Sequence, residues 1–280
     1  MKKFISVFLS IIMLFSCFSV STSAAYKYRY VVLGDSIAYG TGLLNASEAC
    51  YGKAVADTCG FVYSNHSVPG ATTHSLIYRL NDNVVSFNVE MADIISISIG
   101  GNDFFDELGT LLYDAIVKKD YKEYDKLAFG VYSNISTAID RIRDRNYDAV
   151  ILLQTLYNPQ FDHLKEVYQQ GADRINDAIY RCARENSGVV VVDVASALNG
   201  DERNFADDTM HPSARGNEKI ANEVLKTLRK LGYTNKTSLN PKVKGIDVIL
   251  GSGVYGAFNY VAYLFKVIAR MKSIIALVMR

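Results

Sequence analysis

An apolar run ends in a polar turn at Arg29-Tyr30-Val31-Val32-Leu33-Gly34-Asp35-Ser36, and this stretch decides the class of fold. Its hydrophobicity is continuous rather than alternating, which predicts a strand buried on both faces, as in a parallel sheet. Short runs of the same apolar kind follow at Phe61 to Ser64, Ile94 to Ile99, Ala149 to Leu153 and Val189 to Val194. The chain is therefore expected to build a sheet of five strands.

Helix-length sequence separates each run from the next. We predict helices at Glu48 to Asp57, Thr73 to Asn81, Phe104 to Lys118, Tyr124 to Arg145, Leu164 to Asn186 and Ser213 to Leu231. The triplet Asn186-Ser187-Gly188 is typical of a helix end, and Pro212 suits the first turn of the last helix. Strands that alternate with helices predict a parallel sheet with right-handed crossovers. The predicted fold is α/β, a three-layer α/β/α sandwich.

Five residues with catalytic potential follow these runs. Ser36 comes directly after the first, Gly70 after the second and Asn102 after the third. Asp208 and His211 lie in the long loop after the fifth. Because ligands of open parallel sheets bind beyond the carboxyl ends of the strands, we expect all five at one edge of the sheet.

A serine, a histidine and a carboxylate together make a nucleophile that works at neutral pH. The hydroxyl needs an adjacent base, and the base needs a partner that fixes its tautomer and steadies the imidazolium. We assign Ser36 as nucleophile, His211 as general base and Asp208 as the partner of that base. Asp207 is a conceivable substitute for Asp208, but we expect it to face solvent.

An ester hydrolase also needs donors for the oxyanion that forms during attack. The backbone N–H groups of Ser36 and Gly70 and the side-chain amide of Asn102 are suitable. Simpler interpretations stay open: a turn or helix cap for the serine, a turn after Pro69 for the glycine and an Asx-turn for the asparagine. Asp35 is expected to bond to nearby backbone and hold its loop.

The order of Ser36, Gly70, Asn102 and Asp208-x-x-His211 resembles that of the SGNH hydrolases, also called GDSL-type esterases and lipases, over roughly residues 28–232. The resemblance implies a flavodoxin-like sheet of five parallel strands in the order 2-1-3-4-5. It also implies hydrolysis of carboxylic esters through an acyl-enzyme. The chain contains no Gly-x-Ser-x-Gly elbow, which argues against the α/β-hydrolase fold.

The N-terminus has the pattern of a secretion signal. Met1-Lys2-Lys3 precedes an apolar run from Phe4 to Phe15 and the small-residue tract Ser21-Thr22-Ser23-Ala24-Ala25. This order predicts a signal peptide at residues 1–25 and a secreted, extracellular protein. Two alternatives stay open, a short membrane anchor and a lipoprotein anchored at Cys17.

Three cysteines remain beyond the predicted signal, and we expect all of them as unpaired thiols. Cys50 lies within the helix predicted at Glu48 to Asp57 and Cys59 just beyond it, and nine positions at a helical rise of about 1.5 Å separate their α-carbons by roughly 13 Å, too far for a disulfide. Cys182, inside another predicted helix, is expected to be a small buried apolar residue.

Composition and charge narrow the class of ligand. With 49% hydrophobic and 21% charged residues, the chain has the composition of an ordinary globular protein. A formal net charge of +1 gives no reason to expect nucleic acid, because phosphate binding requires a clustered basic face. The histidines His66, His74, His163 and His211 show no paired spacing, so we predict no metal and no cofactor. Of these, His66 and His74 flank the Gly70 loop; lining of the pocket is one interpretation, and ordinary loop residues are the favoured one.

The end of the chain has no counterpart in the resemblance. We divide the chain into the signal at 1–25, a catalytic domain at 26–233, a polar linker at 234–245 and a tail at 246–280. Polar and apolar residues of the tail fall on opposite helical stripes, which predicts a basic amphipathic helix. The favoured interpretation docks it on the catalytic domain. The alternative places it on an anionic membrane surface, as a peripheral contact.

The expected function is that of a secreted serine esterase or lipase, acting on a lipid or other small-molecule ester. A polysaccharide O-acetyl esterase of the same fold is the alternative. Sugar-binding grooves often use Trp platforms, which this chain lacks, although its 19 tyrosines offer a substitute. A rival of another class is a non-catalytic cell-surface binding protein, because a fold does not guarantee its chemistry.

Overall fold

The computed structural model describes residues 26–160, 164–240 and 245–248. The predicted signal at 1–25, the alternative lipidation site at Cys17, His163 and the tail from residue 249 onwards lie outside the described residues. No helix in the described part of the chain is long and apolar enough to cross a membrane.

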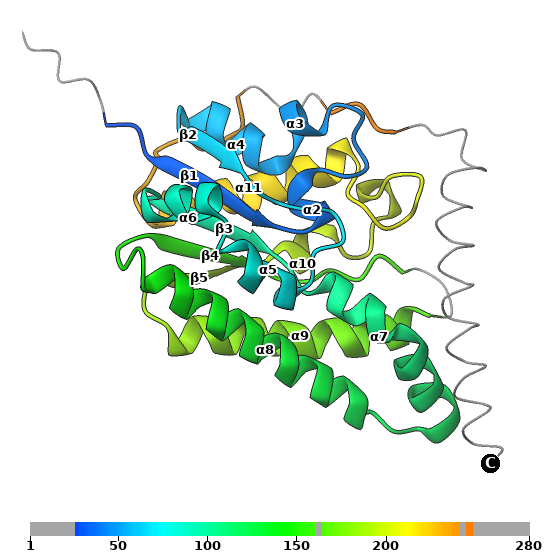
Figure 1. The fold of residues 1–280 in the computed structure, drawn as a ribbon. Coiled ribbons are helices and arrows are strands. Elements are labelled where there is room, and N and C mark those ends of the chain that lie inside the picture. Colours follow the sequence, from blue (N-terminus) through cyan, green and yellow to red (C-terminus); the bar gives the residue numbers. More distant parts are fainter. Residues whose placement is uncertain (1–25, 161–163, 241–244, 249–280) are drawn as a thin grey trace, which may run out of the picture.

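Five parallel strands form one sheet in the order β2-β1-β3-β4-β5 (Figure 1). The strands are β1 (Arg29–Gly34), β2 (Val62–Asn65), β3 (Ile94–Ser98), β4 (Val150–Gln154) and β5 (Val189–Val192). Each begins and ends within two residues of its predicted run. Helices cover both faces of the sheet, so the predicted three-layer α/β/α sandwich and its strand order are confirmed.

The helices alternate with the strands along the chain. They are α2 (Ser36–Tyr39), α3 (Ala46–Ala49), α4 (Tyr51–Cys59), α5 (Thr73–Arg79), α6 (Asn83–Glu90), α7 (Gly101–Tyr113), α8 (Lys122–Arg143), α9 (Lys165–Glu185), α10 (Val194–Leu198) and α11 (Ala214–Lys230), with a π-helical turn η1 (Asp114–Lys118) and a 3-10 turn η2 (Glu202–Asn204).

Apolar side chains of the sheet pack into two cores, one on each face. In β1, Val31 and Leu33 join the core under α5 to α9, while Tyr30 and Val32 join the core under α4, α10 and α11. All four are at most 2% exposed. Burial on both faces is the reason that the run is apolar at every position instead of every second one.

Three sequence-based helix predictions need correction. The helix expected at Glu48 to Asp57 is two helices, α3 and α4, because the backbone of Cys50 is extended (φ −60°, ψ 155°). Tyr51 then starts α4 by donating its N–H to Oδ1 of Asn217 on α11, at 3.1 Å. The helix expected at Phe104 to Lys118 begins earlier, at Gly101, and ends in the π-helical turn.

The third correction concerns the start of the last helix. Pro212 lies before the helix and not in its first turn. Ser213 is the N-cap, since its Oγ accepts the N–H of Gly216 at 3.2 Å. A side-chain oxygen that satisfies one of the unpaired N–H groups of a first turn is the usual way to begin a helix.

The cysteines of the described chain are free thiols. Cys50 and Cys182 are buried, and burial raises the pKa of the Cys182 thiol, so it behaves as an apolar core residue.

Part of the predicted linker packs against the predicted catalytic domain. Leu239 is 7% exposed within the core under α11, and the N–H of Asn240 donates to Oγ1 of Thr58.

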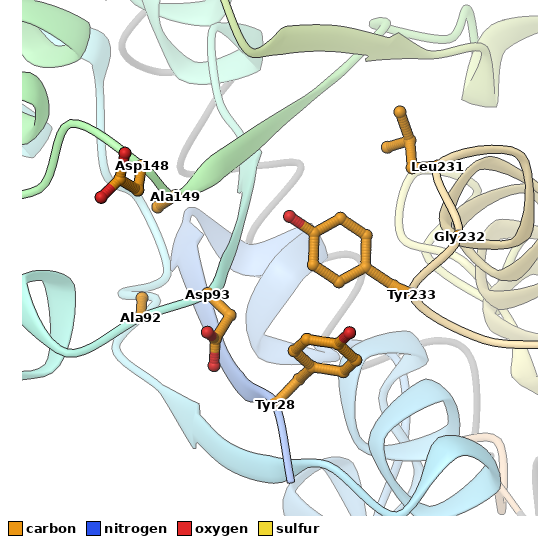
Figure 2. Close-up of a pocket in the computed structure, with 8 residues that line it drawn as sticks. All are labelled: Tyr28, Ala92, Asp93, Asp148, Ala149, Leu231, Gly232 and Tyr233. Carbon is orange, nitrogen blue, oxygen red and sulfur yellow. The ribbon is translucent and has the colours of Figure 1, made fainter. Parts of the chain in front are cut away.

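A small cavity of about 300 Å³ opens at the amino-terminal edge of the sheet (Figure 2). Tyr28, Asp93 and Asp148 line it from the residues just before β1, β3 and β4, and Tyr233 lines it from the end of α11. None of the motif residues is among those that line it. This edge of the sheet therefore has no part in the predicted site.

Gly34 lets β1 and β3 end side by side. Its φ is +141°, and a Cβ at this position would overlap the carbonyl oxygen of Ser98 in β3. Asp35 donates its N–H to the same oxygen at 3.1 Å. Only glycine fits here, and the turn that leads to Ser36 is thereby fixed to the end of β3.

Replacing Gly34 with alanine is expected to destabilise the protein far more than replacing Gly60 with alanine. Both positions have positive φ, +141° and +71°, so each substitution strains the backbone by about 1–3 kcal/mol. Only at Gly34 would the new methyl group meet backbone, since the space beside Gly60 is open to 4 Å. Urea denaturation should show a loss of unfolding free energy at least twice as large for G34A as for G60A. Equal losses would contradict the close approach of the two strands.

Candidate active site

Ser36, His211 and Asp208 lie in one row of contacts. Nε2 of His211 is 2.9 Å from Oγ of Ser36, and Nδ1 is 2.5 Å from Oδ2 of Asp208. Ser36 is the first residue of α2, while the other two lie in the loop between η2 and α11. The fold thus brings together three residues that the sequence singles out from its two ends.

Asp208 also holds the turn in which it lies. Its Oδ1 accepts the N–H groups of Met210 at 3.0 Å and of His211 at 2.9 Å. Burial by itself would raise the pKa of Asp208, but the hydrogen bond and the charge of His211 outweigh burial, so the pKa is lowered. The carboxylate is therefore ionised at neutral pH. Asp207 is exposed, as expected, and the His211 ring contacts its neighbour instead.

The loop that carries this pair closes on itself. Ala206 donates its N–H to the carbonyl of His211, and Thr209 donates to the carbonyl of Ala206, both at 2.8 Å. Thr209 has a φ of +58°, which is uncommon for a residue other than glycine. Tyr157, after β4, donates its hydroxyl to the carbonyl of Met210 at 2.8 Å. Backbone and side-chain bonds therefore restrain the histidine from several sides.

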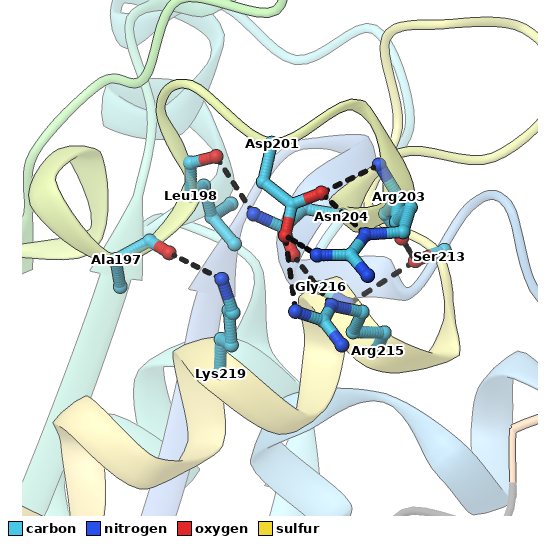
Figure 3. Close-up of polar contacts among 9 residues, drawn as sticks. All are labelled: Ala197, Leu198, Asp201, Arg203, Asn204, Ser213, Arg215, Gly216 and Lys219. Carbon is cyan, nitrogen blue, oxygen red and sulfur yellow. Dashed lines mark hydrogen bonds and ion pairs between the residues drawn. The ribbon is translucent and has the colours of Figure 1, made fainter.

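A cluster of polar contacts fastens the two ends of this loop to α11 (Figure 3). The Asp201 carboxylate accepts from Arg203 at 2.8 and 2.9 Å and from Arg215 on α11 at 3.0 Å. Asn204, which is fully buried, accepts from Arg215 and donates to the carbonyl of Leu198 at 2.8 Å. Residues on both sides of the loop are thus bonded to one another.

The predicted oxyanion donors line the same pocket as the serine. The N–H of Ser36 is at the first position of α2, where a helix offers no internal acceptor. Nδ2 of Asn102 donates to the carbonyl of Ala71 at 2.8 Å. An amide nitrogen carries two protons, so this bond aims the side chain and leaves a second N–H for a ligand. Gly70, with a φ of +82°, lies beside them in an exposed turn.

Asp103 is a site residue that sequence reasoning missed. It accepts from the N–H of Thr73 at 2.9 Å and from its hydroxyl at 2.5 Å, and Asn134 of α8 donates to that hydroxyl at 3.0 Å. These bonds tie the start of α5, and with it the Gly70 turn, to α7. The position of Asp103 next to Asn102 in the sequence could have identified it as part of the site.

A pocket of about 840 Å³ extends from the serine, within the usual size range for small-molecule sites. All five predicted site residues, Ser36, Gly70, Asn102, Asp208 and His211, are among those that line it. The rest of the wall is largely apolar, and it includes Ile99, Phe105, Leu112, Leu156, Leu164 and Tyr168. Gln154 and Thr155, at the end of β4, also line the pocket. Because ligands of open parallel sheets bind beyond the carboxyl ends of the strands, the position of these two residues at the end of a predicted strand could have identified them.

Asp35, which directly precedes Ser36 in the chain, is a buried acid. It is 3% exposed, and its Oδ1 accepts the N–H of Ile37 at 2.9 Å, which caps α2 as expected. Burial raises the pKa of Asp35 to about 7, although the Ile37 bond and the charge of His211 oppose the shift. The site therefore holds two acids with opposite shifts, since the pKa of Asp208 is lowered.

The remaining histidines of the described chain lie away from this row. His74 packs edge-on against Tyr78, and burial lowers the pKa of His66. Neither lines the pocket. Within the residues that the structure describes, no group of three or more His, Cys, Asp or Glu side chains could hold a metal ion.

Known proteins match the chain over the region that contains the site. The model of the GDSL-like Lipase/Acylhydrolase family matches residues 32–219. Over 218 residues the chain is 23% identical to the spore germination lipase LipC of Bacillus licheniformis, covering 73% of this chain and 96% of that protein.

Two solved structures share the fold. The lipase Lip_vut3 from a goat rumen metagenome has a TM-score of 0.60 and 23% identity, over 75% of this chain and 99% of that one. Axe2, an acetyl-xylooligosaccharide esterase from Geobacillus stearothermophilus, has a TM-score of 0.53 and 19% identity, over 74% and 95%. At these levels of sequence identity, the similarity to the two solved structures shows a shared fold and nothing more.

The raised pKa of Asp35 predicts a specific dependence of stability on pH. Between the unfolded pKa of about 4 and the folded pKa of about 7, the folded state holds a proton that the unfolded state has lost. Stability therefore falls as pH rises through this window, by up to about 4 kcal/mol, and is then constant. Asp35→Asn keeps a capping oxygen and is expected to flatten the change. Urea unfolding at about pH 5 and about pH 8 measures it.

Asp82→Asn is the matched control for this prediction. Asp82 caps α6 by accepting from Val84 and Val85, and these bonds lower its pKa. Its contribution is fully present above the unfolded pKa of about 4 and is lost only in stronger acid. The control should therefore lose the same stability at about pH 5 and about pH 8 and keep the wild-type fall between them. A wild-type protein whose stability does not fall between the two pH values would rule out a buried neutral Asp35.

Proposed function

The chain belongs to the GDSL-like lipase/acylhydrolase family, and from this premise we propose that it is a serine esterase that hydrolyses acyl esters through a covalent acyl-enzyme. The observation that carries the proposal is the row in which Nε2 of His211 reaches Oγ of Ser36 and Nδ1 reaches Asp208. Family membership supports ester hydrolysis, and the contacts support the serine mechanism.

Attack begins at Oγ of Ser36, which bonds to the ester carbonyl carbon as Nε2 of His211 removes its proton. Asp208 accepts a hydrogen bond from the Nδ1–H of His211, and its ionised carboxylate stabilises the imidazolium that forms. The N–H groups of Ser36 and Gly70 and the Asn102 amide donate to the oxyanion. The imidazolium then protonates the leaving alcohol. Water attacks the acyl group in the same way and releases the acid.

The pocket wall supports an acyl chain as the part of the substrate that is bound. Apolar side chains of α7, of the segment after β4 and of α9 line it beyond the oxyanion donors. An acyl chain there would remove apolar surface from water, which stabilises the complex by about 0.8 kcal/mol for each CH2 group. The similarity to a lipase of Bacillus licheniformis points to the same class of substrate.

An O-acetyl esterase acting on polysaccharide remains the second candidate, because a protein of that activity shares the fold. An acetyl group would fill little of the 840 Å³ cavity. We further propose that the enzyme acts outside the cytoplasm, on the strength of the sequence at residues 1–25.

Active-site labelling separates an esterase from a non-catalytic binding protein. A fluorophosphonate should form one adduct, on Ser36, and S36A should lose the adduct and about 10⁶-fold in kcat without unfolding. Asp208→Asn should lose about 10⁴-fold in kcat, because the tautomer of His211 is no longer fixed. Asp207→Asn is the matched control and should keep its activity. A folded protein without an adduct on Ser36 would refute the proposal.

Acyl-chain length separates the two candidate substrates. With monomeric p-nitrophenyl esters, kcat/KM should rise about fourfold for each added methylene until the pocket is filled. Phe105→Ala, in the pocket wall, should reduce this gain for long chains and leave acetate hydrolysis nearly unchanged. Phe87→Ala, which removes an exposed side chain of α6 outside the pocket wall, is the control. Highest activity on acetate, together with hydrolysis of acetylated xylan, would favour the O-acetyl esterase instead.

A further inference from the structure

A short segment late in the chain is paired with the loop that follows α2. Residues 245–248, here called the strap, run antiparallel to this loop. Leu44 donates its N–H to the carbonyl of Ile246 at 2.8 Å, and Val248 donates its N–H to the carbonyl of Gly42 at 2.9 Å. The strap lies beyond the region that the family model matches.

The strap is also fastened to the start of α11. Oδ1 of Asp247 accepts the N–H of Ala214, the first residue of that helix, at 2.6 Å. A Cβ on Gly245 would lie 2.9 Å from Cβ of Ala214, so the backbone of the strap runs against the same residue. Ala214 follows His211 by three positions in the chain. The strap therefore holds the end of the loop that carries the proposed general base.

The loop after α2 contacts both partners of the proposed proton transfer. Thr41 donates its N–H to the carbonyl of Ser36 at 2.9 Å. A Cβ on Gly42 would lie 3.2 Å from Cβ of His211 and 3.0 Å from the carbonyl oxygen of Pro212, so the backbone passes close to both residues. The segment with which the strap pairs is thus bonded to the proposed nucleophile and lies against the proposed base.

These contacts bear on the length of one hydrogen bond. The bond between Nε2 of His211 and Oγ of Ser36 joins residues that are 175 positions apart in the chain. Its length depends on how α2 and the start of α11 lie relative to each other. The strap bonds to the segments next to both, which limits the movement of one against the other. A displacement of about 1 Å in a catalytic geometry can cost about 100-fold in rate.

We propose that the strap is a clamp that holds the loop of His211 against α2, and that Asp247 is the positioning residue of this clamp. Asp247 does not line the pocket, so it acts through Ala214 and not on a bound ligand. The effect of the clamp on kcat rests on the proposed esterase function. Its hold on His211 can be measured without catalysis.

Replacing Asp247 with alanine removes the acceptor of the Ala214 N–H. It should lower kcat for a soluble ester about tenfold with KM within about twofold, because acylation and deacylation both use His211 and the pocket wall is unchanged. Asp247→Asn keeps an oxygen acceptor and should recover most of the loss. Asp82→Ala is the matched control: it also removes a helix cap, that of α6, and should lower stability without lowering kcat. Wild-type kcat in folded Asp247→Ala would overturn the proposal.

Gly245→Ala tests the backbone contact of the strap. The new methyl group would meet Cβ of Ala214 at 2.9 Å, so the strap and α11 must move apart and kcat should fall as it does in Asp247→Ala. Gly130→Ala is the matched control, since the space beside this residue of α8 is open to 4 Å. Equal kcat in the two glycine variants would also overturn the proposal.

Proton NMR separates the clamp from the proposed esterase function. The Nδ1–H of His211, which is bonded to Asp208, should give a downfield signal that His211→Gln removes. A looser loop in Asp247→Ala should speed the exchange of this proton with water and broaden its signal, whereas the signal should stay sharp in Asp82→Ala. An unchanged signal in Asp247→Ala would refute the clamp. A wild-type protein that keeps the signal but forms no phosphonate adduct on Ser36 would refute only the esterase function.

Discussion

The carbonyl oxygen of Ser98 occupies the space that any side chain on residue 34 would need. β1 can end beside β3 only because that residue is glycine, and Asp35 then donates its N–H to the same oxygen. The chain turns there, Asp35 caps α2, and Ser36 begins that helix within reach of His211. The position of Ser36, the proposed nucleophile, is therefore set by the sheet edge. Sites supported by regular elements hold their geometry better than sites on free loops.

The proposed general base, His211, reaches Ser36 from a loop late in the chain. Asp201, Asn204 and Arg215 hold the ends of the loop against α11, and Tyr157 holds its middle. Within the loop, Asp208 and His211 contact each other over a single turn. Two separately supported parts thus meet at one hydrogen bond, between the serine hydroxyl and the imidazole.

Sequence alone predicted what depends on local pattern. The strands were visible because burial on both faces leaves an uninterrupted apolar run, and the Asp208–His211 contact was visible because it spans three residues. Three short helices were missed, α2, α6 and α10. Each follows an aspartate cap, and in so few residues a cap and a turn have the same pattern. The bonds of Asp103 to Thr73 and of Tyr157 to Met210 join distant elements, so only packing reveals them.

Because the proposed base and carboxylate share one tight turn, and Ser36 begins the helix fixed at the sheet edge, the contacts among these three residues depend little on most of the segments between the strands. Those segments, including α7 and the stretch after β4, supply most of the apolar pocket wall. Apart from Asn102, Asp103 and Tyr157, which hold parts of the site, their residues can change without altering the distances within the proposed triad. Substrate preference can therefore diverge through these segments while the catalytic geometry is inherited unchanged.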